Sequence, residues 1–438
     1  MVAAGPPSIC YLCRRKFPSR DLLIRHERMS DFHRQNTEKQ EEHTQHRKDE
    51  LRSAITNLRQ MIYDIDGSVG GAEEAVQAHR TVLEMQLRQL LGEYGQAQEL
   101  LEDCRNQKLA SRDGASAKRV LTREARVGKL MFSAGVSSWR GNKDVQEDRY
   151  LIEIELLSPE GLAIAGFAVL DGHSGSLCVD QMVERLPANL QKCLSTKPSL
   201  TEEYLTQAVT EACLLTDDEF LHKARELEVL DGSTLILALI FPETGHGARE
   251  AGACRVLIAN VGDSRAVLCR ACTNPDGEPG LAAVRLSEDH KPGRADEQRR
   301  IEAQGGLVDV QGVWRVFTPG PTTFGGRAIA RWGLAVSRAF GDLLLKEPER
   351  FGCSGVLPGG LINAIPEIQT VDISASDRFL VLACDGVWDV LSDEESVVAC
   401  AGQNSCDLAA NALVRRSFAA GSDDNLTALI LTWRSDGS

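Results

Sequence analysis

Long apolar runs are absent from the 438-residue sequence, the longest being Leu235 to Phe241, which is too short to span a bilayer. The N-terminus has Arg14, Arg15 and Lys16 where a secretory signal would carry its apolar core, and Val follows the first Met where myristoylation needs Gly. We therefore expect an intracellular protein, cytoplasmic or nuclear or both, with no membrane partner.

Positive charge is also scarce, because 49 Lys and Arg stand against 63 Asp and Glu, a net charge of −14. Such a chain is not a general polyanion binder, and any nucleic-acid site must be a local basic patch.

A disulfide framework is missing too, since the 13 cysteines are odd in number and scattered. Cys269 and Cys272 have Cys-x-x-Cys spacing but no second ligand pair nearby, so we treat that spacing as chance.

The composition divides the chain into three zones, which we predict to be three domains: 1–36, 37–127 and 128–438. The first is small and basic, and the second lacks proline and is rich in Glu, Gln, Arg, Leu and Ala. In the second, Leu51, Ile55, Leu58, Ile62 and Ile65 recur at three- and four-residue steps. This predicts two helices separated by a Gly-rich turn, forming either a helical hairpin or a coiled coil that dimerises the chain.

The third zone mixes short apolar runs, bounded by turn residues, with longer helical patterns. We expect strands at 150–157, 162–170, 234–241, 255–260, 266–269, 378–384 and 425–433, and helices at 176–194, 201–226, 295–303, 393–401 and 406–419. The helices are grouped and do not alternate strictly with strands. This grouping predicts an α+β layered fold and not a doubly wound sheet.

The first zone contains four residues at zinc-finger spacing: Cys10, Cys13, His26 and His33. Two thiolates and two imidazoles suit tetrahedral Zn²⁺, although the six-residue gap between the histidines is longer than usual. A segment this small cannot bury enough apolar surface alone, so zinc would contribute to its folding.

The segment CYLCRRKFPSRDLLIRHERMSDFHRQN resembles the two-Cys two-His zinc finger of RNA-binding-motif splicing regulators, and basic residues outnumber acidic ones within it. The resemblance implies a targeting module for RNA, whereas a protein-docking finger remains the alternative. One finger alone would bind nucleic acid weakly.

Acidic residues stand at the expected strand ends of the third zone, each near Gly, His or Asn; they are Glu147, Asp148, Asp171, Asp263, Asp385 and Asp424. Carboxylates gathered at one edge of a sheet cannot all stay ionised without cations. Hard oxygen ligands suit Mg²⁺ or Mn²⁺. Two such ions commonly serve the hydrolysis of phosphate esters.

An ordered set of strings from about 134 to 434 resembles the metal-dependent PPM, or type 2C, serine/threonine protein phosphatases. The strings include LDGHSG, DGST, IANVGDSRAVL, LSEDHKPGRADEQRRIEAQGG, LAVSRAFGD, LVLACDGVWDVLSDEE and GSDDNLT. The resemblance implies an αββα sandwich of two antiparallel sheets flanked by helices, with a binuclear Mn²⁺/Mg²⁺ centre and phosphorylated proteins as substrates.

By this resemblance, Asp171 would bridge the two cations. The other ligands would be Glu147, the carbonyl of Gly172, Asp385 and Asp424. Asp148 would orient a bound water, and Asp263 would contribute with Asp385 to a weaker third site. His173 would protonate the leaving oxygen, and a metal-bridged hydroxide would attack phosphorus. Lys143 stands where the family often has Arg, so it keeps the charge for the substrate phosphate but not the bidentate geometry.

Residues 307–333 form a longer segment than the family usually has between its matching strings. Its Gly and Pro content predicts a mobile loop, whose Arg315, Arg327 and Arg331 could meet an acidic phosphopeptide or could simply be solvated.

Two functions remain open. The first is a metal-dependent phosphatase with an N-terminal targeting module, and the second is a zinc-finger and coiled-coil adaptor whose phosphatase-like domain binds without turnover. Every matched ligand position is intact, which favours the enzyme. The sequence does not identify the substrate, the choice between Mn²⁺ and Mg²⁺, the ligand of the finger or the oligomeric state.

Overall fold

The computed structural model describes residues 123–435 except 244–252, 274–277, 325–326 and 330–332, together with 8–10, 15–17 and a few helical residues between 45 and 61. The chain divides into two compact units, Met1–Arg119 and Val120–Ser438. In the first unit, β1 (Ser8–Cys10) pairs antiparallel with β2 (Arg15–Phe17). The rest of the predicted finger and most of the predicted helical segment lie outside the described residues.

Two antiparallel sheets form the centre of the second unit. The five-stranded sheet has the order β19 (Glu367–Asp372), β10 (Cys254–Val261), β9 (Leu235–Pro242), β6 (Ala163–Leu170) and β5 (Arg149–Leu157). The six-stranded sheet has the order β12 (Pro279–Arg285), β11 (Arg265–Thr273), β20 (Asp377–Ala383), β21 (Leu426–Ser435), β4 (Leu130–Trp139) and β3 (Arg123–Val127).

The sheets stack face to face, and side chains from both fill the space between them. Phe132 and Leu429 of the six-stranded sheet pack there with Phe167 and Ile236 of the five-stranded sheet, all fully buried. Central strands such as β6 are buried on both faces, which explains their nearly continuous apolar sequences.

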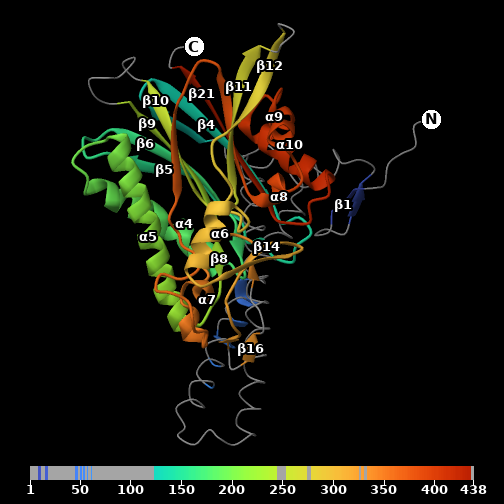
Figure 1. Ribbon diagram of the computed structural model, residues 1–438. Helices are drawn as coiled ribbons and strands as arrows, with labels where there is room; N and C mark the ends of the chain where they lie inside the picture. The colour runs from blue at the N-terminus through green and yellow to red at the C-terminus, as the bar shows by residue number, and fades with distance from the viewer. Residues whose placement is uncertain are drawn as a thin grey trace, which may run out of the picture. The chain divides into compact units, whose positions relative to one another are not determined.

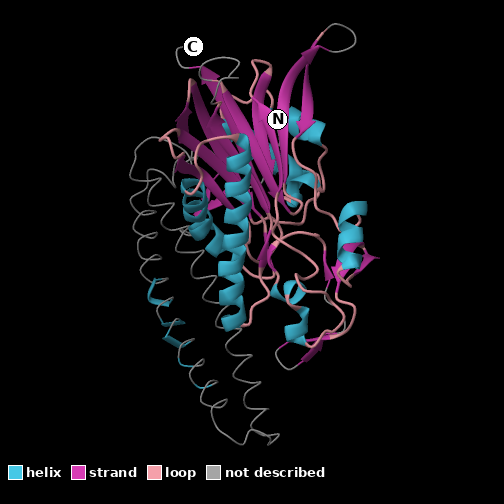
Figure 2. Cartoon of the chain, turned by 60° about the vertical axis from the view of Figure 1, so that its left-hand side comes forward, coloured by secondary structure: helices cyan, strands magenta, loops and turns pink. Residues whose placement is uncertain are grey.

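Helices cover the outer face of each sheet. α4 (Leu177–Ser195) and α5 (Glu202–Leu227) pack on the five-stranded sheet, and α9 (Asp393–Cys400) and α10 (Cys406–Ala419) pack on the six-stranded sheet (Figure 1). Figure 2 shows the strands stacked between these layers. The α+β class and the αββα order predicted from the sequence are confirmed.

Serine and threonine caps begin three of these helices, as expected for such residues at an N-cap. The hydroxyls of Thr201 and Ser405 accept hydrogen bonds from the backbone at the first turns of α5 and α10. Ser392 and Glu395 form a reciprocal capping box at the start of α9.

Shorter elements surround one end of the sandwich. They are β7 (Gly172–His173), β8 (Gly232–Ser233), α6 (Ala295–Ala303), β17 (Gly333–Leu334), β18 (Phe340–Gly341), α7 (Leu343–Lys346), the 3-10 helix η1 (Pro348–Phe351) and α8 (Asp385–Trp388). β18, β8 and β7, in that order, form a small antiparallel sheet that brings together three segments distant in the sequence.

The segment predicted to be a mobile loop contains strands. β13 (Leu307–Gln311) and β14 (Val313–Phe317) form a hairpin that turns at Gly312, whose φ of 72° suits glycine. β15 (Thr322–Phe324) pairs with β16 (Arg327–Ile329). The Arg315 guanidinium donates to the Gly333 carbonyl at 2.9 Å, and Arg331 lies outside the described residues.

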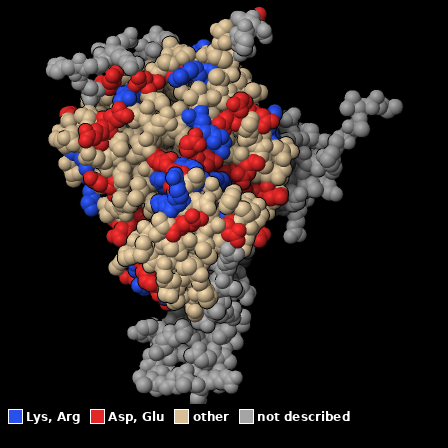
Figure 3. All heavy atoms as spheres, viewed as in Figure 1, with Lys and Arg blue, Asp and Glu red and all other residues tan. Residues whose placement is uncertain are grey.

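Within the part of the chain that the structure describes, no helix combines the length and apolarity needed to cross a membrane. Figure 3 shows basic and acidic side chains interspersed over one face of the described part.

Candidate metal centre

The predicted carboxylates come together because the strands that carry them are paired. Arg149 of β5 pairs with Leu170 of β6, so Glu147 and Asp148 before β5 lie beside Asp171 after β6. In the other sheet, the register of Ala383 with Ala428 places the start of α8 next to the loop before β21. That register brings Asp385 and Asp424 together, one from each segment.

Asp171 lies at the centre of this group. Burial raises the pKa of Asp171 well above its usual range, and the charges of Asp385, Asp148 and Asp263 raise it further. Burial likewise raises the pKa of Asp385 to about 8, with Asp263 and Asp389 adding to the effect. Carboxylates that oppose one another's ionisation in this way require a cation to stay charged together.

Asp148 carries carboxylate oxygens that are suited to a cation. Its side chain is buried, and neither carboxylate oxygen receives a hydrogen bond of acceptable geometry. Burial raises its pKa to about 6, although the nearby Thr427 hydroxyl and Cys384 thiol act in the opposite direction. These bare oxygens and the neighbouring carboxylates are the hard donors that Mn²⁺ and Mg²⁺ prefer, so the residues fit such ions.

Asn425 fixes the loop that carries Glu147. Its side-chain amide donates to the carbonyls of Arg140 and Val145 at 2.8 and 3.0 Å, and its carbonyl oxygen accepts from the Glu147 backbone at 2.8 Å. The Glu147 carboxylate in turn accepts from the Gly175 backbone at 2.7 Å. The sequence analysis gave Asn425 no role, although it stands in the GSDDNLT string.

Gly172 is required by the close packing of two loops. A Cβ atom there would lie 2.6 Å from the carbonyl oxygen of Glu147. The backbone of the predicted carbonyl ligand therefore lies against the segment that carries the predicted carboxylate ligand.

Lys143 contacts the centre directly. Its ammonium lies 2.9 Å from the Asp424 carboxylate, and half of its side chain is exposed. Burial acts to lower the pKa of Lys143, but the hydrogen bond and the charge of Asp424 outweigh it and raise the pKa.

A second lysine lies beside the residues expected at the third metal position. The Lys291 ammonium forms an ion pair with Asp263, and Asp389 lies near both. Burial opposes the charge of Lys291, yet Asp263 raises its pKa. Both Lys291 and Asp389 occur in strings quoted for the family resemblance, but the sequence did not single them out.

His173 is paired with a residue that the sequence reasoning missed. Its Nε2 atom lies 2.8 Å from the Oδ2 atom of Asp342, whose side chain is almost completely buried. Burial acts to lower the pKa of His173, but the charge and hydrogen bond of Asp342 raise it. Asp342 is the last residue of the LAVSRAFGD string, which was its only sequence signal.

An ion network anchors the segment that leads to Asp342. The buried Glu297 of α6 lies 2.8 Å from both Arg300 and Arg338. Arg300 also donates to the Ser337 carbonyl at 2.7 Å. Burial opposes ionisation of Glu297, but the two arginines lower its pKa to about 2.

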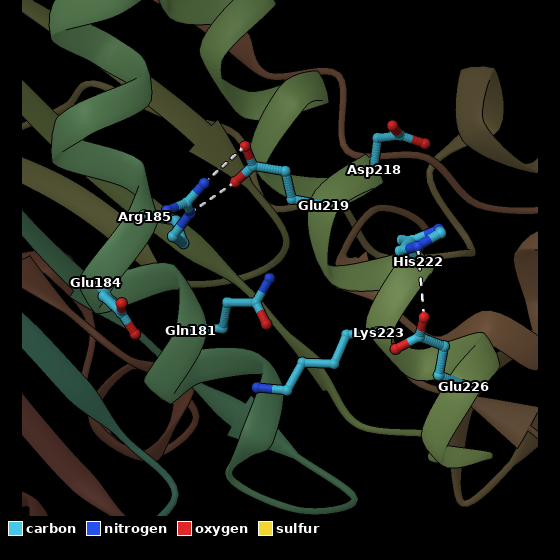
Figure 4. A pocket seen from close by; sticks show the side chains of 8 residues that line it. All are labelled: Gln181, Glu184, Arg185, Asp218, Glu219, His222, Lys223 and Glu226. Atoms are coloured by element: carbon cyan, nitrogen blue, oxygen red, sulfur yellow. Dashed lines mark hydrogen bonds and ion pairs between the residues drawn. The ribbon is translucent and has the colours of Figure 1, made fainter.

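A cavity of about 490 Å³ lies between α4 and α5, and its lining contains none of the carboxylates of the candidate metal centre (Figure 4). Arg185 and Glu219 form an ion pair across it at 2.9 Å, and His222 lies 3.5 Å from Glu226. None of the predicted catalytic or metal-ligating residues lines this cavity.

The predicted zinc ligands fall almost entirely outside the described residues. The backbone of Cys10 ends β1, whereas Cys13, His26 and His33 are not among the residues described. The zinc finger is therefore not confirmed.

Comparison with known proteins identifies the class of protein. A family model described as "Protein phosphatase 2C" matches residues 132–426. This chain belongs to that family, as the ordered strings in its sequence led us to expect.

Two curated relatives from Arabidopsis thaliana illustrate the similarity. "Probable protein phosphatase 2C 76" is 34% identical over 309 residues, which are 70% of this chain and 60% of that protein. "Probable protein phosphatase 2C 59" is 35% identical over 305 residues, or 70% of this chain and 81% of that protein. A rice relative, "Probable protein phosphatase 2C 52", is matched over only 51% of its length.

Solved structures share the fold. A serine-threonine phosphatase 2C from Toxoplasma gondii aligns with a TM-score of 0.54 and 22% identity, over 72% of this chain and 99% of that one. A phosphatase from a pathogenic strain of Toxoplasma gondii aligns with a TM-score of 0.51 and 25% identity, over 71% of this chain and 95% of that one.

Proposed function

We propose that this protein is a Mn²⁺- or Mg²⁺-dependent phosphatase that hydrolyses phosphoserine and phosphothreonine in proteins. The observation that carries the proposal is the cluster around Asp171, in which buried and partly buried carboxylates raise one another's pKa beside a paired histidine. Membership of the protein phosphatase 2C family supports the same conclusion.

Two cations would be held by the carboxylates that meet at Asp171. The residues that would hold them are Asp171, Glu147, the Gly172 carbonyl, Asp385 and Asp424. Asp148 would orient a bound water, and Asp263, Asp385 and Asp389 could hold a third ion. When bound, such cations supply Lewis acidity and acidify a water molecule.

The remaining chemistry falls to two cationic side chains. His173 would deliver a proton to the seryl or threonyl oxygen as it leaves, because Asp342 orients its ring and favours the charged form. Lys143 would attract the substrate phosphate through its half-exposed ammonium, as a point charge and without the fork of an arginine.

The test is the release of phosphate from a phosphothreonine peptide by the purified chain with Mn²⁺, compared with excess EDTA. Asp171→Asn should abolish most turnover, and Asp372→Asn, at the edge of the five-stranded sheet, should leave it unchanged. Turnover in EDTA contradicts the metal assignment. Binding of the phosphopeptide without any turnover would instead identify the adaptor function.

We further propose that residues 1–36 bind one Zn²⁺ through Cys10, Cys13, His26 and His33 and serve as a targeting module. The antiparallel pairing of β1, which ends at Cys10, with β2 supports this, because a short paired element at this place is compatible with a finger. Zinc analysis of the full chain, compared with Cys13→Ser, tests the site. Loss of RNA or of protein partners in that variant distinguishes the two targets.

We also propose that the protein works in a reducing, intracellular location. We propose further that residues 37–127 form a dimer. No disulfide joins any of the ten cysteines whose side chains the structure describes, which supports a cytoplasmic or nuclear compartment. Sedimentation of the full chain and of a chain lacking residues 37–127 tests the dimer.

A further inference from the structure

Asp217 is a buried carboxylate of α5 to which the proposed mechanism gives no part. One of its oxygens accepts a hydrogen bond from the backbone N–H of Gly341 at 2.8 Å, and both oxygens lie 2.6 Å from the ammonium of Lys346. The same ammonium donates to the Ala339 carbonyl at 2.8 Å. A single side chain of α5 therefore holds both the end of β18 and the end of α7.

Asp342, the partner of His173, is the residue between β18 and α7. Its φ of 52° lies in the left-handed region, which is unfavourable for a residue other than glycine. Such a backbone conformation persists only where the surrounding contacts impose it. Asp217 supplies two of these contacts, since it binds Gly341 directly before Asp342 and Lys346 one helical turn after it.

The direction of the Asp342 carboxylate depends on that backbone. Its Oδ2 atom lies 2.8 Å from the Nε2 atom of His173, whereas within the described part of the chain its Oδ1 atom receives no hydrogen bond. Because no donor fixes Oδ1, a displacement of the backbone would carry Oδ2 away from His173. The N–H of Asp342 donates to the Asp231 carbonyl at 2.9 Å, which adds a backbone anchor on the side opposite Lys346 in the sequence.

We propose that Asp217 is a positioning residue, which holds Asp342 where its carboxylate orients the ring of His173. The hydrogen bonds described for Asp217 go to β18 and α7, and none of them goes to a residue placed in the candidate metal centre. Its effect should therefore fall on the delivery of a proton to the leaving oxygen and not on the binding of metal ions. This catalytic consequence rests on the proposed phosphatase function, whereas the orientation of the ring does not.

The test compares kcat of the full-length chain for two substrates that differ in their need for an acid. The seryl oxygen of a phosphoserine peptide must be protonated as it leaves, whereas p-nitrophenolate leaves without a proton. Asp217→Asn should slow hydrolysis of the peptide at least about fivefold and that of p-nitrophenyl phosphate less than about twofold. An equal loss with the two substrates, or no loss with the peptide, overturns the proposal.

The ratio of the two rates does not depend on how much of a preparation is folded, because both are measured on the same sample. Asp217→Asn combined with Lys346→Met removes both charges, so it leaves neither charge of the pair buried without its partner. This second variant should show the same selective loss with the peptide. An unchanged ratio in it overturns the proposal.

Asp218→Asn is the matched control, because Asp218 is the next residue of α5 and its side chain is exposed. Neither rate should change by more than about twofold, and a selective loss with the peptide would overturn the assignment to Asp217. Asp217→Asn added to Asp342→Asn should cost less than about a further twofold with the peptide, since effects that pass through one group are not additive. Multiplication of the two single losses overturns the proposal.

Nitrogen NMR of histidine-labelled full-length chain observes the ring of His173 without turnover. The His173 signals, assigned by their absence in His173→Gln, should shift in Asp217→Asn at a fixed pH and stay in place in Asp218→Asn. Unshifted His173 signals in Asp217→Asn overturn the proposal. A chain that hydrolyses neither substrate but shows the shift would refute the proposed function and leave the positioning by Asp217 standing.

Discussion

The imidazole of His173 and the carboxylate of Asp342 meet at 2.8 Å across 169 positions of sequence. Their approach depends on Gly232, where a Cβ atom would lie 2.2 Å from the Oδ2 atom of Asp342 and 2.3 Å from the Nε2 atom of His173. Asp342 itself has a φ of 52°, an unusual conformation for a residue other than glycine. Because Nε2 faces Asp342, the other ring nitrogen is the one available to substrate.

Asp342→Asn should therefore slow the hydrolysis of a phosphoserine peptide by roughly tenfold to a hundredfold. This is less than the roughly 10²- to 10⁴-fold that a general acid contributes, because the variant keeps His173 itself. The same variant should change the rate with p-nitrophenyl phosphate by less than about threefold, because that leaving group needs no proton. Measurement of kcat for both substrates checks the prediction. Equal losses with the two substrates would mean that Asp342 has only a structural role, and Asp372→Asn serves as the control.

Asn425→Ala should weaken Mn²⁺ binding by about tenfold or more, since residues that orient metal ligands commonly contribute that much. The variant loses the hydrogen bonds that hold the Glu147 loop against the start of β21. Calorimetric titration with Mn²⁺ gives the affinity. Asn142→Ala in the same loop removes only an exposed contact to Asp423 and should bind Mn²⁺ like the unaltered chain.

Glu297→Gln should reduce the free energy of unfolding at pH 7 by roughly 3 kcal/mol, since a pKa lowered from 4.5 to about 2 corresponds to that order of stabilisation. The folded state holds this carboxylate ionised more strongly than the unfolded state does. The contribution is therefore fully present above about pH 4.5 and is lost as the pH falls toward 2.

Urea unfolding of Glu297→Gln and of the unaltered chain at pH 7 and pH 3 checks this dependence. The difference between them should shrink at pH 3. The control is Glu302→Gln, because Glu302 is exposed on the same helix and the only hydrogen bond described for its carboxylate comes from Gln298. A difference that is the same at both pH values would assign the effect to packing.

A fragment of residues 120–438 should be more stable than one of residues 128–438 by roughly 2 kcal/mol or more. β3 pairs along β4, and its Val127 is 1% exposed. Deleting β3 removes this buried side chain from the core and opens the apolar surface beneath it to water. The Cys254 thiol also donates to the Val127 carbonyl at 3.1 Å. Thermal unfolding of the two fragments, each with Mn²⁺ removed, measures the difference, and equal melting temperatures would contradict it.

Much of the second unit could be predicted because its local signals agree with its tertiary structure. The helix expected over 295–303 matches α6, and the one over 406–419 matches α10. The helix expected over 201–226 is shifted by one residue, because Thr201 caps α5 from outside it. The buried strands were recognisable because apolar residues are required on both of their faces.

The carboxylates of the centre were predictable for a different reason. Each stands in a short string next to a strand end, and the ordered strings carry the family resemblance. Lys291, Asp342 and Asn425 were not singled out, because their importance comes from partners 28, 169 and 278 positions away in the sequence. The hairpin of β13 and β14 was missed because the glycine and proline residues later in the segment indicated a loop, and we extended that prediction to the whole segment.

Asp171 follows a strand of the five-stranded sheet, whereas Asp385 and Asp424 belong to segments of the six-stranded sheet. An ion shared by these carboxylates would therefore fasten one layer of the sandwich to the other. Unfolding would have to release that ion before the layers could separate. At an ion concentration a hundredfold above the dissociation constant, mass action alone would add about 2.7 kcal/mol to the free energy of unfolding. The cellular supply of Mn²⁺ or Mg²⁺ would then set the lifetime of the folded protein as well as its rate of turnover.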